Sequence, residues 1–161
     1  MRGMVWFRTD IRVDDNPALT SALNQCKEIM GIYIFSQTQW EIHNESNIKH
    51  EFLLRNLYKL NESLAKLNVP LVAFNSDSYR TLPQDLSSFA AKHKIDHVFC
   101  NNEFGINETK RDKNSSDLLK KQGILFSSFN DQVIYEPGFL TTGQGNPFSV
   151  FTPFKRRWVE N

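Results

Sequence analysis

The chain has 161 residues, of which 40% are hydrophobic and 23% are charged, and its formal net charge is +1. This length and composition are ordinary for one globular domain, and the balanced charge excludes a global field that would attract nucleic acid or membranes. The two cysteines match no zinc-binding or redox spacing. No signal peptide and no apolar stretch of roughly 20 residues, as a membrane span needs, is found. We therefore expect a cytoplasmic location, with neither a membrane nor a metal as partner.

In the first part of the chain, short apolar runs alternate with amphipathic segments. Met4–Phe7 and Glu28–Phe35 predict buried strands, because apolar and β-branched residues fill them. Asn16–Gln25 predicts a helix that opens with an Asn-Pro pair, a common N-terminal signal. The polar segment Gln37–Asn47 predicts a loop. Ile48–Leu67 carries apolar residues at three- and four-residue spacings and predicts the longest helix.

The alternation continues to residue 129. Three further strands are predicted, at Val69–Asn75, His97–Asn101 and Ile124–Phe129. Two further helices are predicted, at Leu82–His93 and at Asn107–Gln122, and Gly123 ends the second of them. Strands that alternate with helices favour a parallel sheet covered on both faces, with right-handed crossovers. The sequence therefore predicts an α/β domain with a doubly wound, five-stranded parallel sheet of the Rossmann-like kind over residues 1–131.

Residues 132–161 differ in character, because glycines and prolines interrupt them and little periodicity remains. They predict an extended C-terminal linker with a helical turn beginning near Pro153. The basic cluster Lys155–Arg157 is flanked there by the aromatic residues Phe148, Phe151, Phe154 and Trp158. Such a mixture can bind nucleic acid, but packing of the aromatic rings against this domain or another one is the favoured interpretation.

In open α/β sheets, ligands bind outside the carboxyl ends of the strands, so the loops there are the candidate sites. The loop after the first strand has no glycine-rich phosphate-binding pattern, which leaves classical dinucleotide binding unsupported. It is instead dense in charge, with Arg8, Asp10, Arg12, Asp14 and Asp15. These residues can form a network that pins the loop and caps the next helix, which is the favoured interpretation, or an interface for a second domain.

The loop after the second strand contains Trp40 and His43. The tryptophan can pack on a helix or stack on a ligand, and the histidine can contact a bound ring or anion. The other three histidines, His50, His93 and His97, are expected to be solvated or structural.

The loop after the fourth strand leads into Asn107 and Glu108. Asn107 is a candidate N-cap, and a carboxylate in the first helical turn is favoured by the helix dipole. Glu108 can serve helix initiation alone, or it can accept two N–H bonds from a heterocycle such as a pterin. Arg111 and Asp112, one turn further on, can brace this helix end. No catalytic triad, metal cluster or carboxylate pair emerges, so these residues alone do not indicate an enzyme and no catalytic residue is assigned.

Several motifs resemble those of one family. They are W-F-R-T-D-I-R-V-D-D-N at Trp6–Asn16, Q-W-E-I-H-N at Gln39–Asn44, N-E-T-K-R-D at Asn107–Asp112 and V-F-T-P-F-K-R-R-W at Val150–Trp158. In order and approximate spacing they resemble the N-terminal part of the DNA photolyase/cryptochrome family. The His-Asn and Asn-Glu motifs look most like bacterial class I cyclobutane pyrimidine dimer photolyases.

The resemblance implies that this is the antenna-chromophore-binding domain of a deoxyribodipyrimidine photolyase. The antenna would be a reduced folate, 5,10-methenyltetrahydrofolate, although a deazaflavin stays open. The partner would be a helical domain of the same parent chain, reached through residues 132–161, which binds FAD and damaged DNA. Light-driven repair would belong to the full-length protein, and this chain alone would be inactive. A freestanding nucleotide-binding module and a cryptochrome-type signalling module are the alternatives.

By resemblance, three residues are expected at the antenna site. Glu108 would bind the pterin through its carboxylate, Asn107 would contact it beside Glu108, and His43 would border the pocket. The family also draws antenna contacts from the helical domain, so the site in this chain would be partial.

Overall fold

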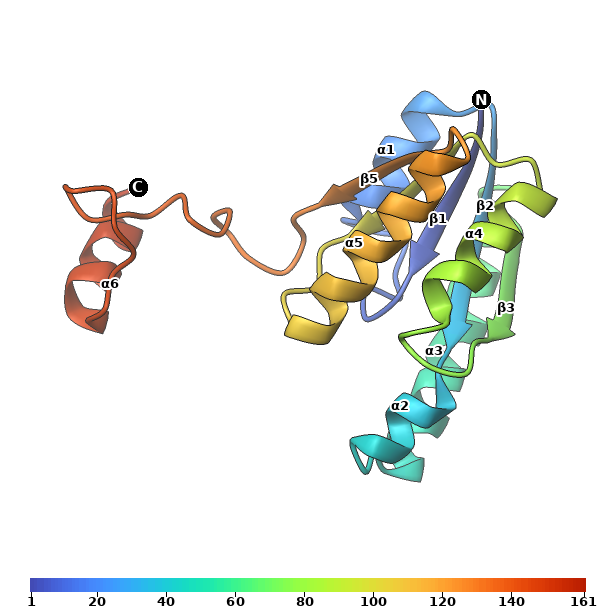
Figure 1. Ribbon diagram of the computed structural model, residues 1–161, viewed down its shortest axis with the longest axis horizontal. Coiled ribbons are helices and arrows are strands. Elements are labelled where there is room, and N and C mark those ends of the chain that lie inside the picture. Colours follow the sequence, from blue (N-terminus) through green and yellow to red (C-terminus); the bar gives the residue numbers. More distant parts are fainter. The chain divides into compact units, whose positions relative to one another are not determined.

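Strands and helices alternate through residues 1–129 of the computed structural model, which describes all residues from 1 to 161 (Figure 1). The strands are β1 (Arg2–Phe7), β2 (Glu28–Phe35), β3 (Leu71–Asn75), β4 (His97–Asn101) and β5 (Leu125–Phe129). The helices of this part are α1 (Pro17–Gln25), α2 (Gln37–Ile42), α3 (Asn47–Lys66), α4 (Leu82–Lys92) and α5 (Ile106–Lys121).

The five strands form one sheet in the order β3-β2-β1-β4-β5, and every neighbouring pair is parallel. The chain first builds the sheet outward from β1 through β2 to β3. It then returns past β1 to add β4 and β5 on the other side. The order therefore reverses between β1 and β4, and this switch point is where such sheets open a crevice at their carboxyl edge. The predicted doubly wound, five-stranded parallel sheet is confirmed.

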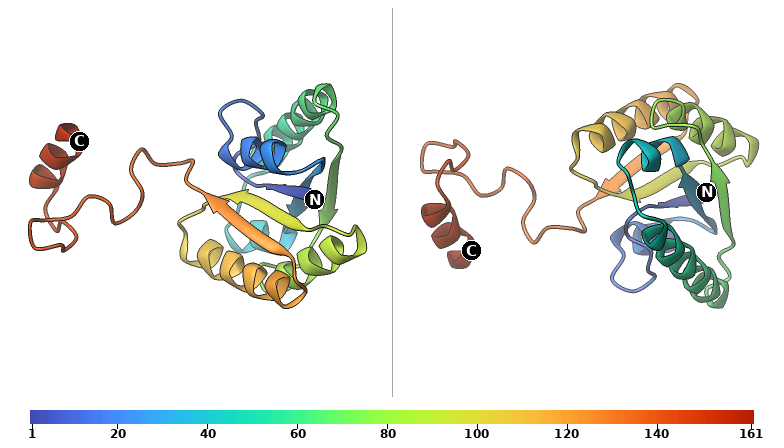
Figure 2. Two further views of the ribbon diagram at one scale, coloured as in Figure 1. Left: turned by 90° about the horizontal axis from the view of Figure 1, so that it is seen from above. Right: turned by 90° about the horizontal axis from the view of Figure 1, so that it is seen from below.

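Two apolar cores lie on the two faces of the sheet, and alternate residues of β1 feed them. Met4 and Trp6 belong to the core under α4 and α5, whereas Val5 and Phe7 belong to the core under α1 and α3. Figure 2 shows the sheet between these two helix layers. All four side chains are at most 1% exposed, and full burial of each contributes about 1.5–3 kcal/mol. Because both faces of β1 are buried, its sequence is continuously apolar and does not alternate between apolar and polar residues.

Two local predictions are wrong. The segment that begins at Gln37 is not a loop throughout, because α2 occupies Gln37–Ile42. No residue of α2 is buried, so the segment lacks the apolar periodicity that predicts a helix. The helix is held in place by the Trp40 ring, which packs on Phe35 and on His50 of α3. The N-cap of α5 is Gly105, not Asn107, because the helix begins at Ile106.

Helix ends follow the expected chemistry elsewhere. The Asn16 side chain caps α1 by accepting a hydrogen bond from the Leu19 amide at 3.1 Å, and Ser46 caps α3 in the same way. Gly123 follows the C-cap of α5 with φ +74°, the left-handed conformation that glycine adopts without strain.

Residues Asn130–Asn161 form a second compact unit, which begins two residues before the predicted boundary. It contains α6 (Phe151–Glu160), a longer helix than the turn predicted near Pro153. Its aromatic rings pack on one another, since Tyr135 stacks on Phe139 and meets Trp158 edge-on. Neither unit contains a helix with the length and apolar character that crossing a membrane requires.

Candidate antenna pocket beside a charged network

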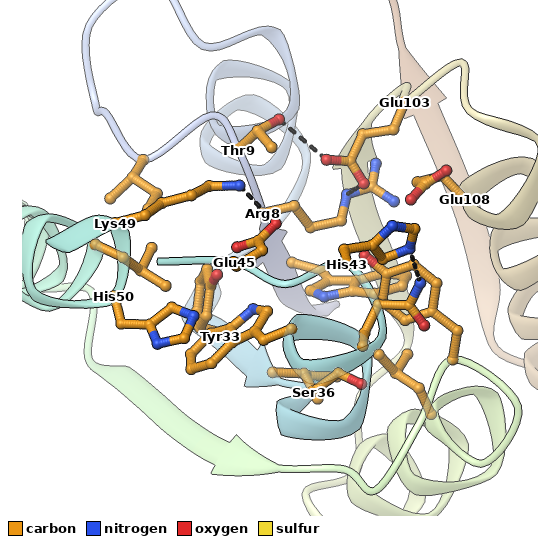
Figure 3. Close-up of a pocket in the computed structure, with 18 of the residues that line it drawn as sticks. Arg8, Thr9, Tyr33, Ser36, His43, Glu45, Lys49, His50, Glu103 and Glu108 are labelled. Atoms are coloured by element: carbon orange, nitrogen blue, oxygen red, sulfur yellow. Dashed lines mark hydrogen bonds and ion pairs between the residues drawn. The ribbon is translucent and has the colours of Figure 1, made fainter. Parts of the chain in front are cut away.

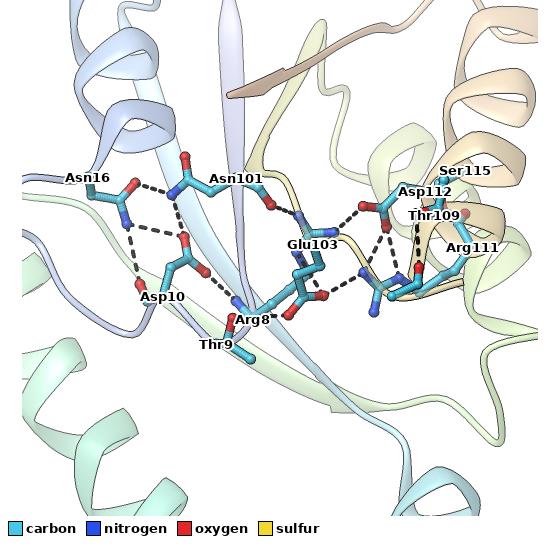
Figure 4. A network of polar contacts seen from close by, with 11 residues as sticks. Arg8, Thr9, Asp10, Asn16, Asn101, Glu103, Thr109, Arg111, Asp112 and Ser115 are labelled. Carbon is cyan, nitrogen blue, oxygen red and sulfur yellow. Dashed lines mark hydrogen bonds and ion pairs between the residues drawn. The ribbon is translucent and has the colours of Figure 1, made fainter. Parts of the chain in front are cut away.

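A buried ionic network fills the crevice at the switch point (Figure 4). Arg8, directly after β1, pairs with Asp112 of α5 at 2.6 Å and donates a hydrogen bond to the Asn101 carbonyl at the end of β4. Arg111 of α5 pairs with the same aspartate at 2.7 Å and with Glu103 at 2.8 Å. Two guanidinium groups thus face two carboxylates. The predicted bracing of this helix end by Arg111 and Asp112 is therefore present.

Amide side chains extend the network to α1. Asn101 donates to the Asp10 carboxylate at 2.6 Å and to the Asn16 side chain at 2.9 Å. Its own side-chain oxygen accepts from the Ala18 amide at 3.1 Å. The charged loop is therefore pinned and α1 is capped, as favoured from the sequence. Arg8 and Asp10 pin the loop and Asn16 caps α1, whereas Asp14 and Asp15 are exposed.

Aromatic rings and guanidinium groups stack in one column beside these ion pairs. Arg8 and Arg111 lie over the Trp6 ring at 4.7 Å and 4.8 Å from its centroid, and Arg111 also lies 4.7 Å from the Tyr79 ring. Guanidinium groups favour such faces because the ring quadrupole attracts cations. The column fixes both arginines, whose side chains are only 6% and 3% exposed.

The carboxyl group of Glu103 shows the electrostatics of this cluster. Burial by itself would raise its pKa, but the positive charges of Arg8 and Arg111 outweigh burial and hold the pKa below its usual range. The carboxylate also accepts a hydrogen bond from the Thr9 hydroxyl at 3.0 Å. Glu103 is therefore ionised at neutral pH and fully partnered.

A pocket of about 570 Å³ lies next to the network, at the carboxyl ends of β1 and β2. This volume falls within the range of roughly 300–1,000 Å³ typical of small-molecule sites. The network forms one wall through Arg8, Glu103 and Arg111, and α2, α3 and α5 supply the others. Because the network occupies the switch-point crevice itself, a ligand has room only beside it.

The structure brings two of the three predicted site residues together. His43, the C-cap of α2, and Glu108, in the first turn of α5, both line the pocket and extend toward each other (Figure 3). Asn107 is exposed and does not line the pocket. The His43 ring nitrogen Nε2 lies 2.6 Å from the Gln39 side-chain nitrogen, which orients the imidazole.

Gly105 makes room for the Glu108 carboxylate. A Cβ atom at this position would collide with that carboxylate, which folds back against the glycine. The backbone of Gly105 is extended, at φ −65° and ψ 150°, so the absence of a side chain matters here for space rather than for conformation.

Aromatic side chains form part of the pocket lining. Tyr33 of β2 and Trp40 of α2 both line it, and burial raises the pKa of Tyr33, which keeps its hydroxyl protonated. Trp40 stacks on His50 with ring centroids 4.1 Å apart, so the tryptophan packs on a helix as the sequence favoured. Planar rings such as these suit a flat heterocyclic ligand.

Ser36 and His50 are among the polar residues of the pocket that sequence reasoning missed. Both line it, and both carry a buried side-chain atom, Ser36 Oγ and His50 Nε2, that has no hydrogen-bond partner. Neither belongs to a recognisable motif. The position of Ser36 directly after a strand's carboxyl end was the one signal that could have identified it.

The protein has no group of three or more His, Cys, Asp or Glu side chains that could hold a metal ion. Cys100 is buried in β4, and burial raises the pKa of its thiol to about 11, so it is not a nucleophile at neutral pH. The arrangement is suited to binding: a planar group between aromatic walls, with Glu108 as a hydrogen-bond acceptor.

Comparison with known proteins connects this site to one family. The family model described as DNA photolyase matches residues 4–161. The deoxyribodipyrimidine photo-lyase of Vibrio cholerae is 38% identical over 156 residues, which cover 97% of this chain and 33% of that protein. The Escherichia coli protein of the same name is 32% identical over 158 residues, covering 98% and 33%.

A solved structure shares the fold as well. The bacterial class III photolyase of Agrobacterium tumefaciens superposes with a TM-score of 0.77 at 27% identity, over 99% of this chain and 32% of that one. The chain thus spans about a third of the length of the relatives it matches. Since the family model covers nearly every residue, the chain belongs to the DNA photolyase family.

Proposed function

We propose that this chain is the antenna-chromophore-binding domain of a deoxyribodipyrimidine photolyase, whose full-length form repairs cyclobutane pyrimidine dimers in DNA with light. The observation that carries the proposal is the pocket beside the switch point, in a chain of the photolyase family. The pocket offers aromatic walls, a carboxylate and a volume that fits one heteroaromatic molecule.

A reduced folate, 5,10-methenyltetrahydrofolate, is the proposed antenna. Its pterin ring presents neighbouring N–H groups, and the Glu108 carboxylate can accept two of them. His43 borders the same end of the pocket, and the Tyr33 ring supplies a flat apolar contact. A deazaflavin is the alternative antenna, and it would rely less on a carboxylate acceptor at this point.

Asn107 has a weaker structural basis than its neighbour. It lies on the exposed side of the first turn of α5, outside the pocket lining. We keep it as a predicted contact at the pocket mouth, where a residue contributed by the rest of the full-length protein would also approach the antenna.

The remaining functions are assigned to the rest of the full-length protein. When bound, the antenna absorbs light, and the energy passes to FAD in a helical domain that also binds the damaged DNA. Residues 130–161 are proposed to lead into that domain. This chain alone is then expected to split no pyrimidine dimers under near-UV or blue light, and dimer reversal by the isolated chain would contradict this part of the proposal.

The test is the Glu108→Ala substitution in the full-length protein. Folate content per flavin is expected to fall about tenfold or more, because the lost carboxylate leaves the pterin N–H groups unpaired, while the flavin content stays unchanged. Glu41→Ala is the matched control, because Glu41 lies on α2 but does not line the pocket. Equal folate content in the two variants would exclude Glu108 as a ligand, and a wild-type protein that binds no folate would contradict the folate assignment itself.

A further inference from the structure

Four helices of the α/β domain end in the same backbone motif. In α2, α3, α4 and α5, the residue after the C-cap has a left-handed backbone, and the next amide donates to the carbonyl five residues earlier. Together these two features form the Schellman motif. The left-handed residues are Asn44, Asn68, Lys94 and Gly123, and the hydrogen bonds of the next amides measure 2.9–3.0 Å.

Three of these four helix ends lead into the sheet. The residue after the left-handed position is Val69 behind α3, Ile95 behind α4 and Ile124 behind α5. Each is at most 7% exposed and belongs to one of the two apolar cores, directly before β3, β4 or β5 begins. An apolar residue at this position commonly accompanies the motif, because it packs back on the last turn of the helix. These three turns therefore serve the fold.

The end of α2 places polar residues there instead. The residue after Asn44 is Glu45, whose carboxylate pairs with Lys49 at 2.6 Å, and the residue before Asn44 is His43. Both His43 and Glu45 line the pocket (Figure 3), whereas Asn44 is exposed and does not line it. No residue of α2 is buried, so this helix end adds nothing to either core. The turn at Asn44 therefore serves the pocket and not the sheet.

We propose that Asn44 is a positioning residue of the antenna site, whose left-handed backbone holds His43 and Glu45 at the pocket. This inference rests on the proposed antenna function. The φ angle of Asn44 is +50°, its amide donates to the Glu41 carbonyl at 3.1 Å, and the Glu45 amide donates to the Trp40 carbonyl at 2.9 Å.

The choice of residue at position 44 decides whether this turn forms without strain. Asparagine and glycine adopt the left-handed conformation readily, whereas a side chain branched at Cβ adopts it only with strain. A β-branched residue at position 44 would weaken both hydrogen bonds of the motif. It would thereby displace His43 and Glu45, although Asn44 itself lies outside the pocket lining.

The test compares two substitutions of Asn44 in the full-length protein. Asn44→Val disfavours the left-handed conformation, and titration with 5,10-methenyltetrahydrofolate, followed by its near-UV absorption, is expected to show about tenfold weaker binding. Asn44→Gly removes the whole side chain but keeps the turn, so its affinity should stay within about twofold of the wild type. Rescue by glycine distinguishes a backbone role from a contact made by the asparagine amide.

Asn68→Val is the matched control. It introduces the same strain at the end of α3, where Asn68 lies outside the antenna pocket and precedes the buried Val69. It is expected to lower the unfolding temperature by about 2 °C or more and to leave folate affinity unchanged. Asn44→Val should lower the unfolding temperature less than Asn68→Val does, because α2 buries no side chain.

Three results would overturn the inference. Normal folate binding by Asn44→Val would refute the positioning role and leave the proposed function intact. Equal losses in Asn44→Val and Asn44→Gly would also refute it, because the asparagine side chain itself would then be needed. If the wild-type protein bound no folate, both the positioning role and the proposed function would be refuted.

Discussion

The ionic network and the pocket adjoin each other at the carboxyl edge of the sheet, but paired charges fill the first and the second is open. In the network, Arg8 and Arg111 each have two carboxylate partners and an aromatic face. In the pocket, Tyr33, Trp40 and Glu108 line about 570 Å³ of space. The contrast separates two roles: the ion-paired cluster stabilises the fold and closes the crevice, whereas the open pocket beside it leaves room for a ligand.

The largest expected effect comes from breaking the network. Arg111→Met should lower the free energy of unfolding by about 3 kcal/mol, because Glu103 and Asp112 stay buried with one guanidinium group fewer. Urea denaturation of the chain measures the change. Arg55→Met is the control: that arginine is exposed on α3 and pairs only with Glu51, so its loss should change stability by about 0.5 kcal/mol or less. Equal effects of the two substitutions would mean that the network does not hold the fold.

A substitution on the pocket side should instead affect binding and spare stability. Gly105→Ala places a methyl group where the Glu108 carboxylate lies, so the carboxylate must turn away. The backbone accepts alanine there, and we expect a change in unfolding free energy of about 0.5 kcal/mol or less. Folate affinity, measured by absorption titration, should fall about tenfold.

The double variant Gly105→Ala/Glu108→Ala tests whether Gly105→Ala lowers folate affinity by displacing the Glu108 carboxylate. If the methyl group acts through the carboxylate, Gly105→Ala has no further effect once Glu108 is alanine. Additive losses would show that Gly105 affects the ligand by another route.

Acid should weaken the network first. Because the folded-state pKa of Glu103 lies below its usual value, its ionised form contributes stability that is fully present above the unfolded-state pKa of about 4.3 and is lost as pH falls through the folded-state pKa. The free energy of unfolding should therefore fall between about pH 5 and pH 3. Glu103→Gln should show a shallower fall over this window, and a slope equal to that of the wild type would contradict the assignment.

Periodicity was sufficient to predict most of the fold. The strands Glu28–Phe35 and His97–Asn101 have the predicted bounds, because apolar runs between polar turns are unambiguous when both faces are buried. Helix α2 was missed because it buries no side chain and is held by one ring, Trp40, which packs on Phe35 and His50. The start of α5 was misplaced because a glycine N-cap gives a weaker signal than Asn107.

The candidate site was predictable only in part. His43 and Glu108 came from family motifs, and the pocket includes both. The charge pattern of the first loop indicated a network, but its partners Glu103 and Arg111 lie some hundred residues further along the chain, and only folding shows which groups meet. Ser36 and His50 stand in no motif, and only the folded structure shows that they line the pocket.

A structure of the full-length protein with 5,10-methenyltetrahydrofolate tests the central claim most directly. The account predicts electron density for the pterin ring against the Glu108 carboxylate, with His43 at the same end of the pocket. Folate bound elsewhere, with this pocket left to solvent, would contradict the claim that the space beside the switch point is the antenna site.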